Sequence, residues 1–324
     1  MMRRALAVLC LLTSPAFAQD AWPSRPIVMF GGFPNGSGVD VYQRRLAEPL
    51  GRALGVPVVV DNRTGAGGNI ASDLVAKARP DGYTLLFATA GTHAINATLY
   101  RSMPFDPFRD VTHIALLGDV PNILIVAPDK RPNLRSCADV LTAARARPGA
   151  LNYASTGNGA STHLAAAQFA AAAGIDVVHV PFRGQPFAMT ALLSGDVDFF
   201  FNQVGPAMGP IQQGQVRGLA VTTPSRVAAL PDVPTVAEAC GLPGFQSTTW
   251  YGIVGPPGMP APIADRLNAE ILKIIDAPEF QRWLVDSQGI APPTTRTREE
   301  FRAVHERDIA SWATVIQRSG ARVD

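Results

Sequence analysis

Glycine- and hydroxyl-rich segments of this chain have the composition of anion-binding turns. The first, Phe33-Pro34-Asn35-Gly36-Ser37-Gly38, follows an apolar run and precedes an amphipathic one. A strand, a tight turn and a helix in that order bring backbone N–H groups to a helix N-terminus, where they attract negative charge. The alternative is an ordinary turn in which Ser37 or Asp40 caps the helix. This segment alone is compatible with both interpretations.

The same pattern recurs further along the chain, each time as a strand end, then small and hydroxyl residues, then a helix start. In α/β sheets, ligands bind beyond the carboxyl ends of the strands, where such turns collect. Capping explains each turn separately, but the set favours a binding site for a small acid. The candidate residues are Thr89, Gly91, Thr92 and His93, then Ser155, Thr156, Gly157, Asn158, Gly159, Ala160 and Ser161, and finally Phe182, Arg183 and Gly184.

Signals for catalysis or for a cofactor are weak. Ser161 lacks the second glycine of a nucleophile elbow, and His163, two positions later on a helix, does not face it. A hydrolase that uses Ser161 with a base from elsewhere remains an alternative. The five histidines show no metal-ligand spacing, so no metal and no cofactor are expected. Of these, His93 and His163 are candidate cleft residues.

The first eighteen residues have the pattern of an export signal. Arg3 and Arg4 precede an apolar core from Ala5 to Leu12, and Ala16-Phe17-Ala18 resembles a cleavage site. The apolar core is too short to span a bilayer. We expect cleavage after Ala18 and a soluble periplasmic product. Removing residues 1–18 leaves 26 basic and 26 acidic side chains, so there is no excess basic charge for binding nucleic acid.

β-rich runs alternate with helical patterns, which predicts an α/β architecture with mainly parallel sheets. About 300 residues exceed the usual size of one core, so two lobes are expected. We assign residues 22–117 with 250–324 to the first lobe and 118–249 to the second. Separate strands are expected at Ile114–Leu117 and Ile123–Ala127. Trp250-Tyr251 could form an apolar wall at the junction or belong to the core.

Two cysteines, Cys137 and Cys240, remain after removal of the signal. They could pair in an oxidising compartment, but one bridge is not a disulfide framework. We expect the two residues in different lobes, which disfavours pairing.

Several motifs together resemble a known family. They are Trp22-Pro23-Ser24-Arg25-Pro26, Val60-Asp61-Asn62-Arg63, Pro80-Asp81-Gly82-Tyr83-Thr84, Gly91-Thr92-His93-Ala94-Ile95-Asn96, His179-Val180-Pro181-Phe182-Arg183-Gly184 and Leu230-Pro231-Asp232-Val233-Pro234-Thr235. In this order they are similar to the extracytoplasmic receptors of tripartite tricarboxylate transporters, the Bug-type binding proteins. The resemblance implies a monomeric two-lobe clamshell of the type II periplasmic-binding-protein class. It also implies a small carboxylate as ligand, no catalysis, and membrane transporter subunits, or else a sensor protein, as partner.

The resemblance also carries over the family's ligand loops. They correspond to residues 33–38, 89–93, 155–161 and 181–184, and the fifth begins at Asn202-Gln203. Backbone N–H groups of the first and third turns are expected to hold a carboxylate, helped by Ser37, Ser155 and Ser161. Arg183 either adds a charge or lies on the surface. This chain departs from the family at Gly36-Ser37-Gly38, where paired glycines are usual, and at Asn202-Gln203, where Asp-Asn is common.

Overall fold

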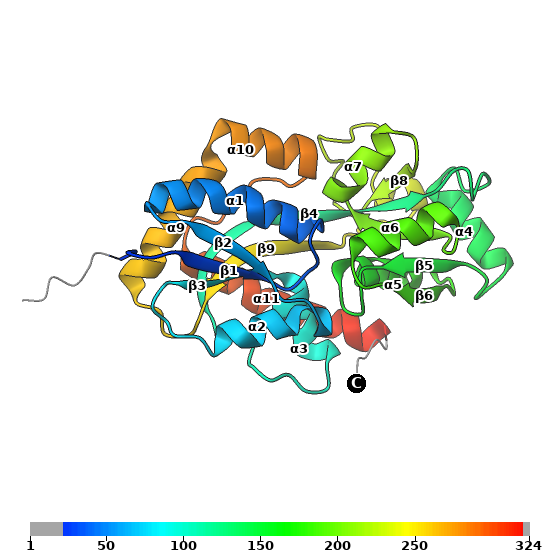
Figure 1. The fold of residues 1–324 in the computed structure, drawn as a ribbon. Helices are drawn as coiled ribbons and strands as arrows, with labels where there is room; N and C mark the ends of the chain where they lie inside the picture. The colour runs from blue at the N-terminus through cyan, green and yellow to red at the C-terminus, as the bar shows by residue number, and fades with distance from the viewer. Residues whose placement is uncertain (1–21, 320–324) are drawn as a thin grey trace, which may run out of the picture.

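The computed structural model describes residues 22–319, which form two lobes side by side (Figure 1). The expected export signal lies outside the described residues. One mixed sheet runs through both lobes in the order β2-β1-β3-β9-β4-β7-β5-β6, and β8 pairs with β4. The strands are β1 Ile27–Gly31, β2 Val58–Asn62, β3 Thr84–Thr89, β4 Thr112–Val126, β5 Asn152–Ser155, β6 Val178–Pro181, β7 Phe199–Gln203, β8 Arg217–Val221 and β9 Thr248–Gly255.

Two long strands carry the chain across the middle of the molecule. β4 pairs with β9 from Thr112 to Pro121 and then with β7 and β8 through Val126. The expectation of two separate strands at 114–117 and 123–127 is therefore wrong, because β4 is continuous. Pairing is parallel among β1, β2 and β3 and among β5, β6 and β7. It is antiparallel where β4 and β9 connect the two groups.

The first lobe packs helices on both faces of β2-β1-β3-β9. Helix α1 (Gly38–Leu54) buries Tyr42, Leu46 and Leu50, which recur every three to four residues on one face. It ends at Gly55, whose φ of 75° is a conformation that glycine adopts without steric cost. The remaining helical segments before β4 are η1 Ala66–Gly68, α2 Asn69–Ala76, η2 Gly91–Ile95 and α3 Asn96–Leu99.

The C-terminal helices return to the first lobe, as the loss of strand signals after residue 255 suggests. Leu267 and Ile271 of α9 and Phe280 of α10 join the same buried cluster as Tyr42 and Leu46. These elements are α9 Ala261–Asp276, α10 Pro278–Arg282, η3 Trp283–Gln288 and α11 Arg298–Ser319. Figure 1 shows α10 above the first lobe and α11 running beneath it towards the second.

The second lobe has its own buried clusters on the two faces of β4-β7-β5-β6. Phe199 and Phe201 pack on one face with α4 and α5, whereas Phe200 packs on the other with α6 and α7. This alternation is the two-residue period of a strand that is covered on both faces. The helices are α4 Cys137–Ala146, α5 Ser161–Ala173, α6 Gln185–Ser194, α7 Val204–Gln212 and α8 Val236–Cys240.

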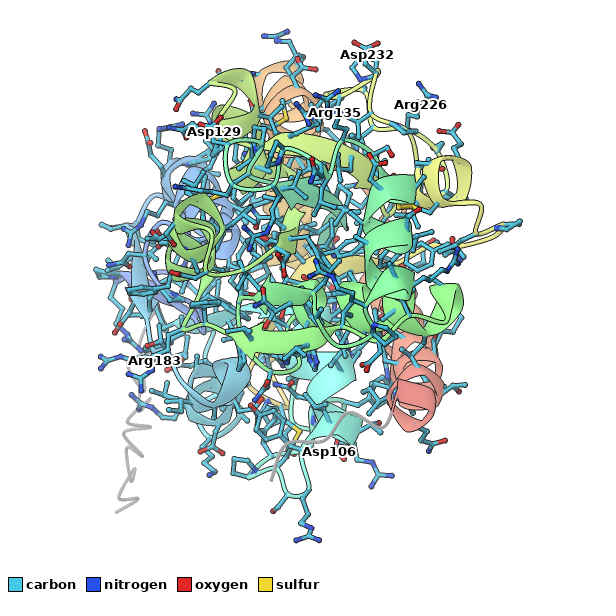
Figure 2. The ribbon with its side chains drawn as sticks, turned by 90° about the vertical axis from the view of Figure 1, so that its right-hand side faces the viewer. Asp106, Asp129, Arg135, Arg183, Arg226 and Asp232 are labelled. Carbon is cyan, nitrogen blue, oxygen red and sulfur yellow. A yellow bond between two sulfur atoms is a disulfide. The ribbon has the colours of Figure 1, made fainter. Side chains whose placement is uncertain are left out.

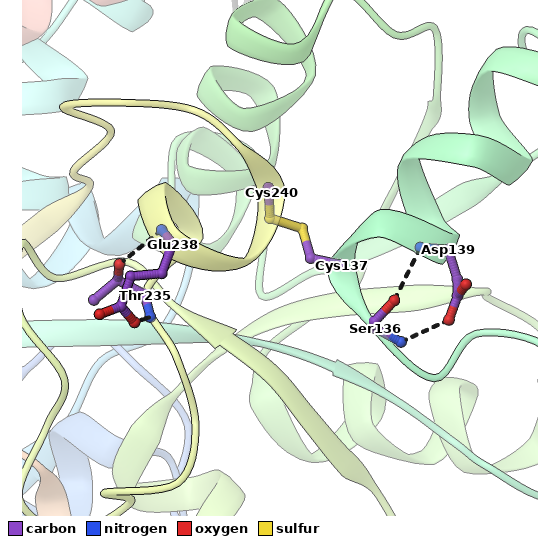
Figure 3. Close-up of a disulfide and its surroundings, with 6 residues drawn as sticks. All are labelled: Ser136, Cys137, Asp139, Thr235, Glu238 and Cys240. Carbon is purple, nitrogen blue, oxygen red and sulfur yellow. Dashed lines mark hydrogen bonds between the residues drawn. A yellow bond between two sulfur atoms is a disulfide. The ribbon is translucent and has the colours of Figure 1, made fainter.

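A disulfide joins the start of α4 to the end of α8 (Figure 3). Cys137 and Cys240 belong to one buried cluster and form a disulfide, so the expectation that they lie in different lobes and stay unpaired is wrong. Their Cα atoms are 5.4 Å apart although 103 positions separate them in the chain. Both helices also begin with complete capping boxes, Ser136 with Asp139 and Thr235 with Glu238 (Figure 3). The packing of α4 against α8 is what brings the two thiols together.

Candidate ligand-binding site

A small cavity lies between the two lobes at the carboxyl ends of the parallel strands. It offers about 40 Å³ for the centres of water-sized molecules. This size suits a small molecule rather than a peptide. Its wall is formed by Phe33, Pro34, Ser37, Val39, Thr89, Gly91, Thr156, Ala160, Ser161, Gly184, Gln185, Gln203, Thr249 and Tyr251.

Four helices begin at this cavity. The N-cap residues of α1, α5, α6 and α7 are Ser37, Ala160, Gly184 and Gln203, and all four line its wall. The N-terminus of a helix carries a partial positive charge and N–H groups without an intrahelical partner. The four helix dipoles therefore make the cavity attractive to an anion.

The N–H groups of three of these helices have no capping side chain. Ala160, Gly184 and Gln203 make no side-chain cap hydrogen bond. Helices α4 and α8, which start away from the cavity, are fully capped. N–H groups left uncapped at a helix start need another acceptor, and an oxyanion in the cavity can provide it.

Among the described residues that line the cavity, none carries a charged side chain. Phe33, Pro34 and Val39 instead provide apolar contact surface. Tyr251 donates a hydrogen bond to Gln203 Oε1 at 2.8 Å, which connects β9 to the start of α7. Burial raises the pKa of the Tyr251 hydroxyl, so it remains a donor throughout the neutral range. The cavity thus combines neutral donors with apolar walls.

The first turn contributes fewer groups than expected. Phe33 and Ser37 lie on the wall, but Gly38 does not, and Asn35 and Gly36 are exposed. The Gly36 N–H donates to Asp40 Oδ2 at 2.9 Å, so it is not available to a ligand. The Ser37 hydroxyl caps α1 by accepting from the Asp40 N–H at 3.3 Å. Both interpretations of this segment therefore apply, because the same serine caps a helix and faces the cavity.

The second turn places Thr89 and Gly91 on the wall and Thr92 and His93 behind it. Thr92 Oγ1 is 2.7 Å from His93 Nδ1, and His93 is fully buried. His305 Nε2 of α11 is 2.9 Å from the His93 carbonyl oxygen. Burial, reinforced by His305 and His113, lowers the pKa of His93 well below its usual value. The ring therefore supports the turn as a neutral group.

In the third turn, Thr156, Ala160 and Ser161 face the cavity, and Gly157, Asn158 and Gly159 do not line it. Ser155 is completely buried, and its hydroxyl contacts His179 rather than the cavity. The Ser161 hydroxyl is 3.5 Å from Asn122 Oδ1, its hydrogen-bond partner among the described residues. The described structure shows no hydrogen bond between Ser161 and a histidine.

The fourth and fifth segments each place one expected residue on the wall, Gly184 and Gln203. Phe182 and Arg183 do not line the cavity, and the Arg183 side chain is exposed at the edge of the molecule (Figure 2). Asn202 is completely buried, and neither of its amide atoms has a hydrogen-bond partner in the described structure. It also lies outside the cavity wall, in contrast to its neighbour Gln203.

Three wall residues were not anticipated: Val39, Gln185 and Thr249. Val39 and Gln185 stand just inside α1 and α6, so extending each glycine-rich turn by one residue into its helix would have found them. Thr249 and Tyr251 lie on β9, whose course between the lobes is a tertiary feature. Tyr251 does form a wall at the junction, as one interpretation of Trp250-Tyr251 proposed, while Trp250 packs with Phe301 in a buried cluster.

Within residues 22–319, no group of histidine, cysteine or acidic side chains could hold a metal ion. The described helices include none with the length and apolar character that crossing a membrane requires.

The profile of the tripartite tricarboxylate transporter family receptors matches residues 42–321. The chain belongs to this family. A UPF0065 protein from the tcbD-tcbE intergenic region of Pseudomonas sp. strain P51 is 43% identical, over 90% of this chain and 88% of the relative. Protein BugT of Bordetella pertussis is 33% identical over 99% of both chains.

Solved structures of family members share the fold. Rpa4515 of R. palustris, determined with adipate, superposes with a TM-score of 0.89 at 32% identity, covering 93% of this chain and 100% of that one. MatC (Rpa3494) of Rhodopseudomonas palustris, determined with bound malate, gives a TM-score of 0.84 at 30% identity, covering 91% and 100%. The expected two-lobe α/β fold and the expected family are therefore confirmed.

Proposed function

We propose that this chain is a periplasmic receptor that captures a small organic carboxylate between its lobes and presents it to the membrane subunits of a tripartite transporter. The observation that supports this most is the convergence of four helix N-caps, Ser37, Ala160, Gly184 and Gln203, on one cavity. Binding without catalysis follows from a wall of neutral donors and apolar groups. Export with cleavage after Ala18 belongs to the same proposal.

The chemistry of the wall narrows the ligand class. Uncapped N–H groups, together with the hydroxyls of Thr156 and Ser161, suit carboxylate oxygens. Phe33, Pro34 and Val39 suit a short aliphatic segment. Adipate and malate, with which the two structures above were determined, combine these two features, which supports the same class of ligand for this chain.

The absence of a carboxylate among the described wall residues disfavours amino acids. A ligand ammonium group inside the closed cavity would lose its hydration without gaining an opposite charge. We therefore expect succinate to bind more tightly than aspartate. Of the pair Asn202-Gln203, Gln203 is the residue on the wall, so we expect this selectivity to depend on Gln203.

Calorimetry and thermal denaturation with a panel of succinate, malate, adipate and aspartate test this proposal. A ligand at 100 times its dissociation constant stabilises a protein by about 2.7 kcal/mol, so a clear rise in melting temperature is expected for at least one diacid. The ligand should be recovered unchanged. Hydrolysis of esters or amides that disappears in Ser161→Ala would contradict the receptor function.

Gln203→Glu tests the selectivity. This change places a carboxylate on the wall and keeps an acceptor for the Tyr251 hydroxyl, so it should improve aspartate relative to succinate. Gln213→Glu is the matched control, since that side chain is exposed at the other end of α7 and lies outside the wall. Equal shifts in both variants would show that the wall does not set selectivity.

A further inference from the structure

Two stacked imidazoles support the third cavity turn from behind. His163 of α5 and His179 of β6 lie with ring centroids 4.0 Å apart and planes 10° from parallel. His179 also stacks against Tyr153 of β5, with ring centroids 5.0 Å apart. The stacked rings are therefore contributed by three different elements. Neither histidine lines the cavity.

Each imidazole contacts one end of the turn. His179 Nε2 is 2.6 Å from Ser155 Oγ, and that oxygen also accepts the Gly157 N–H at 3.2 Å. At the other end, the Gly159 N–H donates to His163 Nδ1 at 3.2 Å. The ligand-facing Thr156, Ala160 and Ser161 lie beside and between these contacts. Fixing the two ends therefore fixes the groups that face the ligand.

The contact to Gly159 determines the charge of His163. A backbone N–H can only donate, so His163 Nδ1 must accept, and the ring must be neutral with its proton on Nε2. Burial lowers the pKa of His163 to about 4. Burial and the neighbouring His163 lower the pKa of His179 to about 3. Tyr153 is the other titratable side chain in the stack, and burial raises its pKa, so it too is neutral.

We propose that His163 and His179 are positioning residues for the ligand, which hold the turn 155–161 in its binding shape as neutral hydrogen-bond partners and contribute no charge to the anion. The proposal rests on the proposed carboxylate-binding function. It differs from the usual role of a histidine at an anion site, where the imidazolium attracts the ligand directly. Since both rings stay neutral, affinity should not rise as pH falls from 8 to 5.5.

Paired substitutions test the proposal by rescue. His163→Leu removes the acceptor for Gly159 and should lower affinity at least tenfold. His163→Asn places an amide oxygen near the same position and should retain affinity within about threefold of the wild type. His179→Leu and His179→Gln form the equivalent pair for Ser155. The proposal would be overturned if, in both pairs, the leucine and amide variants lost affinity equally. It would also be overturned if the affinity of the wild type rose as pH falls through 6.5.

Nitrogen NMR of the unliganded protein provides a test that needs no ligand and no variant. His163 should show a neutral ring with an unprotonated Nδ1 at pH 7, and the Gly159 amide should show a hydrogen bond. A charged ring or a protonated Nδ1 would overturn the proposal. If the wild type binds none of the carboxylates in the panel, the proposed function fails, whereas this spectrum still decides whether the imidazoles hold the turn.

Discussion

The hydroxyl of Tyr251 donates to Gln203 Oε1 at 2.8 Å, which joins the crossing strand β9 to the first turn of α7 at the wall of the cavity. The two residues belong to the segments that we assign to different lobes, so we expect the bond to form only when the lobes are together. It would then couple the position of the lobes to the shape of the cavity.

Tyr251→Phe should weaken ligand binding without changing the fold. The variant loses one buried hydrogen bond of about 0.5–1.5 kcal/mol, which corresponds to a roughly 2–10-fold loss of affinity by calorimetry. Tyr83→Phe is the control, because its hydroxyl contacts Ser24 away from the cavity. If both variants bind as the wild type does, the Tyr251–Gln203 bond has no part in binding.

Gly184→Ala should hinder closure. A Cβ at this position would lie 2.8 Å from Pro34 Cγ across the cleft, and the φ of 112° is unfavourable for alanine. We expect a loss of affinity of tenfold or more, and a larger radius of gyration for the variant with ligand, measured by X-ray scattering. Gly174→Ala is the control for backbone strain. Gly174 also has a positive φ, of 61°, but no atom lies within 4 Å of the added Cβ, so this variant has the strain without a contact like the one to Pro34. Similar affinity losses in the two variants would mean that strain alone is responsible.

Removing the Cys137–Cys240 bridge should lower the free energy of unfolding by about 2–4 kcal/mol, since it closes a long loop in the unfolded chain. The bridge joins α4 to α8, and neither helix contributes to the cavity wall. Urea denaturation of the double serine variant should therefore show reduced stability, while calorimetry shows unchanged affinity. A parallel loss of affinity would show that the bridge also shapes the cavity.

Asp308 should make the protein less stable as pH rises from about 4 to above 6. Burial, followed by the nearby charge of Asp119, raises its carboxyl pKa to about 6, although the hydrogen bond from Trp250 opposes this. The folded state thus retains a proton that the unfolded state has lost, and this stabilisation disappears through pH 6. Asp308→Asn keeps an acceptor for the Trp250 N–H, which donates at 2.7 Å.

We therefore expect Asp308→Asn to be more stable than the wild type at pH 8, by on the order of 1–3 kcal/mol, and similar to it near pH 3.5. Urea denaturation at the two pH values measures this difference. The exposed Asp129→Asn (Figure 2) should change stability little at either pH. The five histidines give the opposite slope in every variant, because their lowered pKa values destabilise the fold as pH falls below about 6.5. If the difference in free energy of unfolding between the wild type and Asp308→Asn were the same at both pH values, Asp308 would not titrate with a raised pKa in the folded protein.

The sequence by itself determined the family, the α/β alternation and the general location of the ligand turns. These features are local or ordered along the chain. The sequence alone is enough to recognise a glycine before a helix, hydroxyl residues after a strand, or motifs in a fixed order. None of these features depends on tertiary contacts. The alternation of helices and strands that the sequence predicts is present in the order in which the structure has it.

Only the tertiary structure decided which residues within each turn face the ligand. Ser155 and Ser161 look equivalent in sequence, but the first contacts His179 and the second lines the cavity. Asn202 and Gln203 alternate because neighbouring strand residues point to opposite faces, and the packing of α7 determines which of them is on the wall. The Cys137–Cys240 bridge likewise depends on α4 meeting α8. Contacts between distant segments leave little trace in a single sequence, because packing rather than local preference places them.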